Sequence, residues 1–411
     1  HDALPILLII QKNKKLYISF TILLGIMTAF GPLLSDLYTP ALPGVQESLH
    51  TTTSNAQLSL SIAMIGIALG QFIFGPLSDK IGRKPSTILI FSAFILTSLG
   101  CFITPGIKSL IVLRFFQGLM GGGAIVIARS TAGDIYQGKK LAKFLSLLMV
   151  INGVLTIVIP LISGGILSFF TWRSIFIFLT GIGIILLLIS IFSMENDKNE
   201  KQNNHINIKF ILKDFGNLLK TKKFVIPLLI QSISYIMLFS YASSAPFITQ
   251  KIYNFSPQQF SIFMTFVGVG LIISSQLAGK LVDFFNRNTI ILLYNVIQII
   301  GAIIVIATLI LNLPAWVYLF SVFFTVIPVS GLGPIAFSLA MEKRTGGSGN
   351  AASLLGLSQF IIGSVIAPLT GIKGSYNIYP YIIILTITII FIIMLLLINN
   401  KQNSLTKNNE S

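Results

Sequence analysis

The residues that could carry chemistry in this sequence are a few charged side chains placed inside long apolar runs. Of the twelve acids, eleven fall in loops, termini or the ends of runs, and Asp36 alone lies within one. Arg114 lies about six residues into a second run. Charges at such positions are costly and therefore indicate function. A carboxyl group in a partly dry site favours its neutral form, so Asp36 could bind a proton from one side and release it to the other.

Each of these two residues also has a plainer interpretation. Tyr38 and two prolines follow Asp36 closely, so the run ends soon after it and Asp36 could be a structural acid near the surface. Arg114 lies close enough to the end of its run for its head group to reach water. If Arg114 instead lies near Asp36, it would favour the charged carboxylate, and the two groups would titrate as a pair.

The rest of the sequence shows what kind of structure must hold these charges. Of the 411 residues, 54% are hydrophobic and only 10% are charged. A soluble domain has about 25% charged residues, so lipid is the expected solvent, where only helices and closed barrels satisfy the backbone. The apolar runs are continuous and about 20 residues long, which is the length of a spanning helix and not of an alternating barrel strand. The sequence therefore predicts an all-α membrane protein.

Twelve such runs predict twelve transmembrane helices. They cover residues 17–38, 56–76, 86–104, 108–132, 143–168, 172–194, 224–249, 258–281, 288–311, 314–341, 351–372 and 378–398. A polar stretch between the sixth and seventh runs divides the chain into two six-helix bundles. The predicted parts are an N-terminal cytoplasmic or interfacial lead at 1–16, a first bundle at 17–194, a cytoplasmic linker at 195–223, a second bundle at 224–398 and a cytoplasmic tail at 399–411.

The basic residues predict how the chain is oriented. With a cytoplasmic N-terminus, the inner segments hold 22 of the 28 lysines and arginines, and the outer loops hold only Lys108, Arg173, Lys251 and Lys373. This distribution follows the positive-inside rule. We therefore expect a multi-pass protein of the bacterial cytoplasmic (inner) membrane with both termini in the cytoplasm. The net charge of +16 then reflects contact with anionic lipids and does not indicate nucleic-acid binding, because it is spread over many short loops.

The two halves share a sequence pattern. GPLSDKIGR begins at Gly75, after the second run, and GKLVDFFNR begins at Gly279, after the eighth. Both read G-x-L-x-D-x-x-x-R, at an offset of 204 residues and at the same place in their half. The match indicates an internal duplication, as in transporters built from repeats. The two bundles are therefore expected to be pseudo-symmetric.

Two motifs of the first half resemble signatures of the major facilitator superfamily, and the resemblance covers essentially all twelve runs. GPLSDKIGRKP at 75–85 resembles the loop signature G-x-L-x-D-x-x-G-R-K/R-x between spans two and three. Arg114-Phe-Phe-Gln117-Gly118 resembles the R-x-x-Q-G signature of span four. The resemblance implies that Arg114 faces a central cavity, touches span one and takes part in proton transfer.

Further motifs resemble one branch of this superfamily. GVLTIVIPLISGG at 153–165 is similar to the span-five signature of twelve-span drug:proton antiporters, although Ile159 stands where glycine is usual. Segments 36–43 and 171–176 resemble the Bcr/CflA-like drug-resistance branch. In span five, the resemblance implies a bend that helps to seal an exporter, whereas plain helix packing would need the same residues. The residues of this span-five motif are Gly153, Pro160, Gly164 and Gly165.

The loop signature implies a conformational latch at the cytoplasmic ends of the helices. Asp79 is expected to face the positive N-terminus of span eleven near Asn350, and Arg83 to pair with Asp134 at the inner end of span four. The charges could also serve only as topology anchors. The latch residues are Gly75, Asp79, Gly82, Arg83, Lys84 and Asp134, with Asp283 and Arg287 as a degraded copy in the second half.

Polar residues within the central runs are candidates for a substrate cavity, because polar side chains at membrane depth usually face protein or a cavity. The 32 phenylalanines would suit a lipophilic ligand, but they are also ordinary lipid-facing residues. The cavity candidates are Gln117, Asn152, Gln231, Tyr235, Tyr241 and Gln359.

The sequence also restricts the energy source. The three histidines lie outside every run and Cys101 is the only cysteine, so we expect no metal site and no disulfide. The chain has no G-x4-G-K-[ST] motif, so we expect no ATP-driven step and no cofactor, with a proton gradient as the driving force.

Together with the resemblance, these observations predict a monomeric, proton-coupled secondary transporter and not an enzyme. It would export lipophilic drugs or related small molecules by alternating access. One alternative is a dedicated exporter or importer of a single metabolite, such as a siderophore, amino acid or sugar derivative. A second is a membrane-embedded enzyme or sensor, although the expected cluster of His, Asp or Ser at one membrane face is missing.

Overall fold

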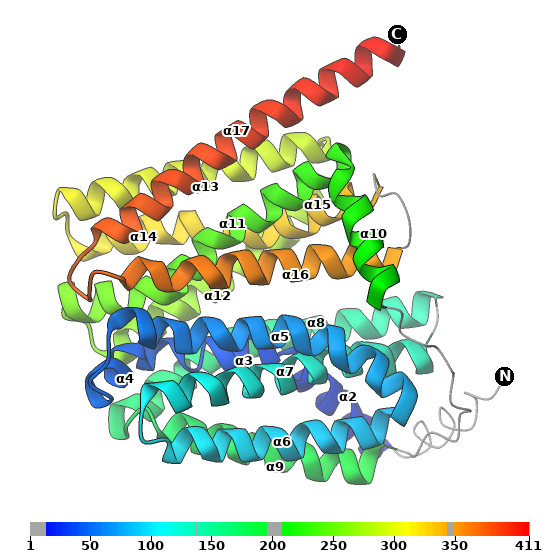
Figure 1. Cartoon of the computed structure of the whole chain (residues 1–411), viewed down its shortest axis with the longest axis vertical. Coiled ribbons are helices and arrows are strands. Elements are labelled where there is room, and N and C mark those ends of the chain that lie inside the picture. The colour runs from blue at the N-terminus through cyan, green and yellow to red at the C-terminus, as the bar shows by residue number, and fades with distance from the viewer. Residues whose placement is uncertain (1–13, 137, 195–207, 343–347, 411) are drawn as a thin grey trace. The chain divides into compact units, whose positions relative to one another are not determined.

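The structure is a computed structural model that describes residues 14–136, 138–194, 208–342 and 348–410. Every regular element in these ranges is a helix (Figure 1). Eleven of these helices are long and apolar enough to cross a membrane, and a bent pair of helical pieces makes a twelfth span. The prediction of an all-α membrane protein with twelve spans is thereby confirmed.

The described residues form two compact units. Unit 1 takes the described parts of 1–51, 58–206 and 256–265, and unit 2 takes those of 52–57, 207–255 and 266–411. Two units agree with the expectation of two bundles. The predicted limits of the bundles stay a prediction, because residues 1–13 and 195–207, which hold the lead and much of the linker, lie outside the described residues.

The first half of the chain contributes eight helices to the described structure. They are α2 Lys14–Thr28, α3 Phe30–Ser35, α4 Leu42–Ser48, α5 Thr53–Ile81, α6 Arg83–Ile103, α7 Ile107–Ile135, α8 Gly138–Phe169 and α9 Ser174–Ser193. A short 3-10 turn, η1 Thr39–Ala41, joins α3 to α4. Gly82 separates α5 from α6 with a φ of +97°, a left-handed conformation that favours glycine. Arg83 is therefore the first residue of α6.

The first span is broken and longer than predicted. Its pieces, Ile18–Thr28 and Phe30–Ser48, meet at an angle of 59°. The break has a local cause, because Pro32 has no amide hydrogen for the carbonyl four residues earlier. Beyond the predicted end at residue 38, two further prolines lie at the first turns of η1 and α4, where proline fits a helix start.

In unit 1, α7 packs against α5 with almost no side chain between the two backbones. Gly118 and Gly122 of α7 lie against the carbonyl oxygens of Ala63 and Ile67 of α5, so a Cβ added at either glycine would clash with backbone. Small residues permit this close approach. It brings Arg114, one turn before Gly118, within reach of the α5 backbone.

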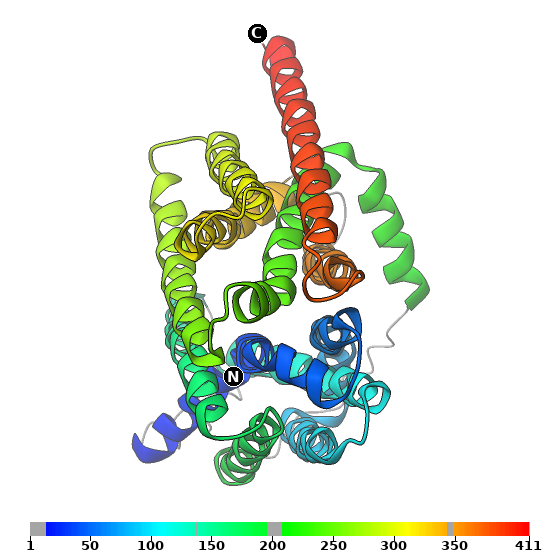
Figure 2. The same cartoon turned by 90° about the vertical axis from the view of Figure 1, so that its left-hand side faces the viewer.

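The second half contributes eight helices as well. They are α10 Ile208–Lys220, α11 Lys222–Phe247, α12 Pro257–Leu281, α13 Arg287–Ile310, α14 Ala315–Val326, α15 Pro328–Glu342, α16 Ser348–Ile366 and α17 Tyr379–Glu410. A π-turn, η2 Ile248–Ile252, extends α11, and a 3-10 turn, η3 Ala367–Gly371, extends α16. The α13 helix packs against both α14 and α15 (Figure 2).

Two features of unit 2 differ from a set of simple straight spans. The predicted span 314–341 is divided into α14 and α15 just before Pro328, because proline has no amide hydrogen for the carbonyl four residues earlier. The α10 helix runs across the ends of α11 and α16 (Figure 1). Leu218 of α10 is buried in an apolar cluster with Phe224 of α11 and Leu355 of α16.

Candidate functional site

Arg114 lies wholly inside unit 1, with no exposed surface. Its Nε donates a hydrogen bond to the Ser59 carbonyl at 3.2 Å, Nη1 to Gln117 Oε1 at 2.6 Å and Nη2 to the Leu34 carbonyl at 2.8 Å. The alternative in which this head group reaches water is therefore wrong. Because the guanidinium is a planar fork of donors, one side chain connects α3, α5 and α7.

Two aromatic rings cover the faces of this guanidinium. Arg114 Cζ lies 4.4 Å from the centre of the Tyr38 ring and 5.9 Å from that of Phe176, which is cation–π range. The expected contact of Arg114 with span one is thus present, through the Leu34 carbonyl and the Tyr38 ring. These two contacts lie on either side of Asp36 in the sequence.

Asp36 is half-buried at the end of α3, and its Oδ1 accepts a hydrogen bond from Ser35 Oγ at 2.7 Å. Among the described residues, no ion pair joins Asp36 to Arg114, and their titration as a pair stays a prediction. The backbone beside Asp36 instead offers Arg114 a neutral acceptor. The Tyr38 amide donates to Ser35 and not to Leu34. The Leu34 carbonyl is therefore available to Arg114, which has neutral oxygens as its acceptors.

The polar cavity candidates of unit 1 have their side chains engaged inside that unit. Gln117 accepts the bond from Arg114 and donates from Nε2 to Ser98 Oγ at 2.8 Å. Asn152 of α8 donates from Nδ2 to the Thr28 carbonyl at 2.9 Å. In this structure both residues therefore support other parts of unit 1, and their predicted contact with substrate stays a prediction.

The cavity candidates of unit 2 lie on α11 and α16. Gln231 and Gln359 are hydrogen-bonded to each other through Nε2 of the first and Oε1 of the second. The half-buried Tyr235 ring lies 6.3 Å from that of Phe239, whereas Tyr241 is almost completely buried. The structure thus brings the two glutamines together, and a role in substrate binding stays a prediction for all four candidates.

Asn295 and Gln298 of α13, which the sequence analysis missed, are completely buried in unit 2. Asn295 Oδ1 accepts a bond from Ser234 Oγ at 3.3 Å. Gln298 Nε2 donates to the carbonyls of Ser234 at 3.4 Å and Thr325 at 3.2 Å. These bonds connect α13 to α11 and α14. The available signal was a pair of amide side chains one turn apart in an apolar run.

The predicted latch residues of unit 1 form a compact charged cluster. Arg83 Nε donates to Asp134 Oδ2 at 2.8 Å, and Nη1 lies 2.6 Å from Asp79 Oδ1. The expected contact of Arg83 with Asp134 is therefore present. Lys84, the next residue of α6, is half-buried. The Asn350 side chain lies outside the described residues, so its contact with Asp79 stays a prediction.

The second half retains more of this cluster than expected. Arg287 is paired with Glu342, and its Nη1 donates to Ser338 Oγ at 3.4 Å. Ser338 stands 204 residues after Asp134, and Glu342 follows one helical turn later. Glu342 was not predicted, because the repeated motif covers only the loops and not the helix ends that face them. Asp79 and Asp283 are both exposed, but among the described residues Asp79 pairs with its arginine, whereas Arg287 pairs with Glu342 and not with Asp283.

The span-five motif lies within the continuous helix α8. Gly164 is pressed against the first turn of α12, because a Cβ added there would clash with Ser261 Cβ and approach Gln258 Cα. Gly165 faces open space, and Pro160 is buried. Gly153 is half-buried. Close packing at Gly164 is therefore present, whereas a bend that seals an exporter stays a prediction.

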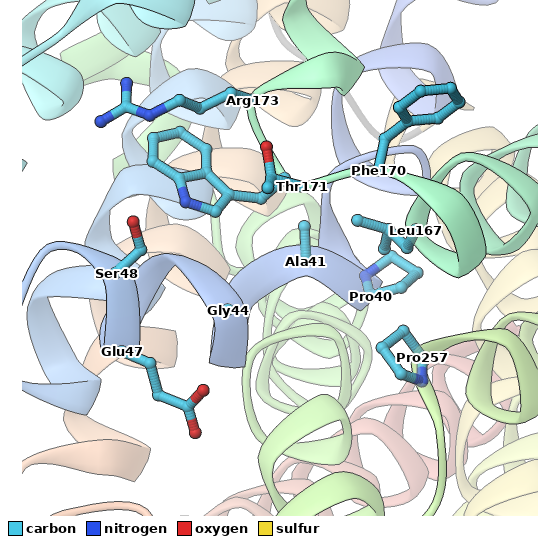
Figure 3. Close-up of a pocket in the computed structure, with 11 residues that line it drawn as sticks. Pro40, Ala41, Gly44, Glu47, Ser48, Leu167, Phe170, Thr171, Arg173 and Pro257 are labelled. Atoms are coloured by element: carbon cyan, nitrogen blue, oxygen red, sulfur yellow. The ribbon is translucent and has the colours of Figure 1, made fainter.

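A pocket of about 540 Å3 opens in unit 1 where α4 meets the connection between α8 and α9 (Figure 3). Its walls include Pro40, Phe170 and Trp172, and Glu47 points away from Arg173 in this view. Arg173 Cζ lies 4.5 Å from the centre of the Trp172 ring, and Nη1 donates to the carbonyls of Phe102 and Thr104 at the end of α6, at 2.7 and 2.9 Å. None of the predicted cavity residues lines this pocket.

The chemistry available to the Asp36 region is the movement of protons and charge. Within the described residues, no group of three or more His, Cys, Asp or Glu side chains could hold a metal ion, and Cys101 is a buried free thiol. The Asp36 carboxyl group can gain and lose a proton, whereas the Arg114 guanidinium keeps its charge. Asp36 lies on a segment that Arg114 contacts. Such an arrangement is suited to convert proton binding into a movement of that segment.

Comparison with known proteins decides the family. The sequence profile described as Major Facilitator Superfamily matches residues 24–368, which is most of the chain. The chain belongs to the major facilitator superfamily. As a member of this superfamily it is a multi-pass membrane transporter, and members bind small-molecule substrates within the membrane.

Two curated relatives place the chain within this superfamily. It is 32% identical to YdgK of Bacillus subtilis, an uncharacterised MFS-type transporter, over 88% of this chain and 90% of the relative. It is 26% identical to the bicyclomycin resistance protein homolog of Haemophilus influenzae, over 87% of this chain and 90% of the relative. These similarities confirm the predicted resemblance to the Bcr/CflA-like branch of the major facilitator superfamily.

Solved major facilitator structures confirm the fold. A crystal structure of a D-xylose–proton symporter aligns with a TM-score of 0.71 at 16% identity, covering 91% of this chain and 96% of that one. The crystal structure of a point mutant of the peptide transporter POT aligns with a TM-score of 0.77 at 12% identity, covering 93% of this chain and 94% of that one. At these identities the likeness concerns the arrangement of helices and not the substrate.

Proposed function

We propose that this transporter is a proton-driven exporter of lipophilic small molecules, with Asp36 as its proton-binding residue. One observation carries the proposal: Asp36 lies half-buried in a broken span, and the buried Arg114 grips that span on both sides of it. A curated relative is named for bicyclomycin resistance, and others are named as multidrug resistance proteins. Both names support an exporter of foreign compounds.

The proposed coupling follows from the charge states of these two residues. When Asp36 is ionised, it is attracted to the fixed positive charge of Arg114, and when it is protonated, this attraction is lost. The broken span carries both Asp36 and two of the contacts of Arg114, so the change acts on the segment itself. Proton binding would thus shift the balance between two conformations, and a cationic substrate could compete for the same carboxylate.

The membrane location, the topology and the latch are part of the same proposal. We place the protein as a monomer in the bacterial cytoplasmic membrane with both termini in the cytoplasm, supported by the 22 of 28 basic residues in the predicted inner segments. Anionic lipids would face these segments. The Arg83 cluster would then lie at the cytoplasmic surface, where its bonds could form in one conformation and break in another.

A measurement of proton release from proteoliposomes tests this function and identifies the substrate class in the same experiment. Purified protein is challenged with lipophilic cations, neutral antibiotics and siderophores while an external dye reports pH. We expect at least one lipophilic compound to release protons from wild type and not from Asp36→Asn. The control is Glu47→Gln, which removes an exposed acid near the end of the same span and should behave as wild type.

Each other outcome changes the proposal. Equal release from wild type and Asp36→Asn contradicts Asp36 as the proton site. A response to one metabolite alone replaces the exporter of lipophilic compounds by a dedicated transporter. No proton movement with any compound contradicts proton coupling.

A further inference from the structure

Pro32 leaves the carbonyl of Thr28 without its helical donor. In a regular helix this carbonyl would accept a bond from the amide of residue 32, and proline has no amide hydrogen. The α2 helix ends at Thr28, and the span bends by 59° at this point. A carbonyl at membrane depth needs another donor, because lipid supplies none.

Asn152 supplies that donor. Its Nδ2 lies 2.9 Å from the Thr28 carbonyl oxygen, on the face of α8 that packs against α2. The adjacent residue of α8, Ile151, lies against Gly25 of α2, so close that a Cβ at position 25 would clash with it. This close approach of the two helices brings the short Asn152 side chain within bonding distance of the bend.

Two further carbonyls of the same span are bonded by side chains of neighbouring helices. Ser163 of α8 donates from Oγ to the Leu37 carbonyl at 2.6 Å, and Arg114 donates to the Leu34 carbonyl. The Ala41 amide, which would reach Leu37 in a regular helix, donates to the Tyr38 carbonyl instead. The segment that carries Asp36 is therefore held by side chains of α7 and α8 as well as by its own backbone.

We propose that Asn152 is a positioning residue for Asp36. By replacing the amide that Pro32 lacks, Asn152 holds the bend of span one and thereby sets the place of the Asp36 carboxyl group. This role differs from the substrate contact predicted for Asn152 from sequence. The inference rests on the proposed function where it treats Asp36 as the proton site, whereas the bend and its hydrogen bond stand without it.

Restoring the missing amide provides a direct test. Pro32→Ala returns an amide hydrogen that can bond to the Thr28 carbonyl, and Asn152→Leu removes the side-chain donor at similar volume. The effect of Asn152→Leu should therefore be large when residue 32 is proline and small when it is alanine. Such dependence of one substitution on another identifies a shared interaction.

The readout is the position of residue 36, measured without transport. Asp36→Cys is placed in a Cys101→Ser background, and the rate of maleimide labelling is followed in membrane vesicles. We expect Asn152→Leu to change this rate by about fivefold or more with Pro32 and by less than about twofold with Pro32→Ala. Ser168→Ala is the matched control on α8, because the Ser168 hydroxyl donates to the Gly164 carbonyl of its own helix. If Asn152→Leu does not accumulate, Asn152→Ala makes the same test.

Two labelling results overturn the inference. An unchanged rate with Asn152→Leu shows that Asn152 does not position residue 36. An equal change in both backgrounds shows that the effect does not pass through the Thr28 carbonyl. In the protein that retains Asp36, we further expect Asn152→Leu to shift the pH midpoint of substrate-induced proton release, and Pro32→Ala to reduce that shift. If the labelling result holds but wild type releases no protons, the proposed function fails and the positioning of residue 36 stands.

Discussion

Arg114 holds a positive charge in the interior of unit 1, where its acceptors among the described residues are neutral. An unpaired buried charge is costly, so its surroundings must replace the water it has lost. Two carbonyl groups, the Gln117 amide oxygen and the faces of two aromatic rings do so. A cation solvated in this way is ready to attract a carboxylate when one becomes ionised nearby.

Arg114→Lys tests how specific this surrounding is. An ammonium group cannot reach three acceptors with the fork geometry of a guanidinium, so at least one carbonyl loses its donor. We expect the free energy of unfolding to fall by about 2–4 kcal/mol, measured as a lower thermal midpoint in detergent. Arg129→Lys is the control, because Arg129 is an exposed residue of the same helix. A midpoint that is unchanged by Arg114→Lys would show that the three hydrogen bonds contribute little.

At the scale of single residues, the sequence predicted which charged residues are functional candidates. It did not predict the atoms that these residues contact. Arg114 and Asp36 stood out because charges in apolar runs are rare. The acceptors of Arg114 could not be predicted, because two of them are backbone carbonyls and every residue has one. Asn152 could be recognised from the sequence as a polar residue within a span. Its partner, the Thr28 carbonyl, could not, because that carbonyl is available only since Pro32 has no amide hydrogen.

At the scale of the helices, the same kind of ion pair between helix ends occurs in both halves of the chain. The arginine at the start of α6 pairs with the acid near the end of α7, and the arginine at the start of α13 pairs with the acid at the end of α15. Each pair connects the first residue of one helix to the end of another in its own unit. Each duplicated loop therefore connects two helix ends through an arginine–acid ion pair, which we call a clasp, in addition to any role in the latch.

A double-mutant cycle on Arg83→Gln and Asp134→Asn measures the first clasp. Arg83 is mostly buried but Asp134 is more than half exposed, so we expect a coupling free energy of about 1 kcal/mol that weakens with added salt. The cycle on Arg287→Gln and Glu342→Gln, in which both side chains are partly exposed, is the comparison. Additive effects of the first two substitutions at low salt would show that the clasp does not stabilise unit 1.

The helices themselves could largely be predicted, because membrane thickness fixes the length of an apolar run. The breaks within them could not be placed as well. Span one was expected to end at residue 38, and the structure continues it through η1 and α4 to Ser48. Pro32, Pro40 and Pro43 indicated that span one would be interrupted. Whether a proline ends a helix or bends it, however, depends on donors supplied by neighbouring helices.

For the molecule as a whole, the charge distribution predicts which ends of the helices face the cytoplasm. Single cysteines introduced in a Cys101→Ser background test it, with Lys80→Cys on the predicted inner side and Lys373→Cys on the outer side. In intact cells, a membrane-impermeant maleimide should label only the outer variant. Labelling of Lys80→Cys alone would reverse the topology, and the direction of transport would then have to be reconsidered.

The central claim is that protonation of Asp36 drives uphill transport. In inverted membrane vesicles with an imposed proton gradient, wild type should accumulate a substrate identified by proton release above its external concentration. Asp36→Asn should still exchange labelled for unlabelled substrate, because the helices and Arg114 remain, but it should accumulate none. Accumulation by Asp36→Asn at the level of wild type would contradict the account and place the coupling at another residue.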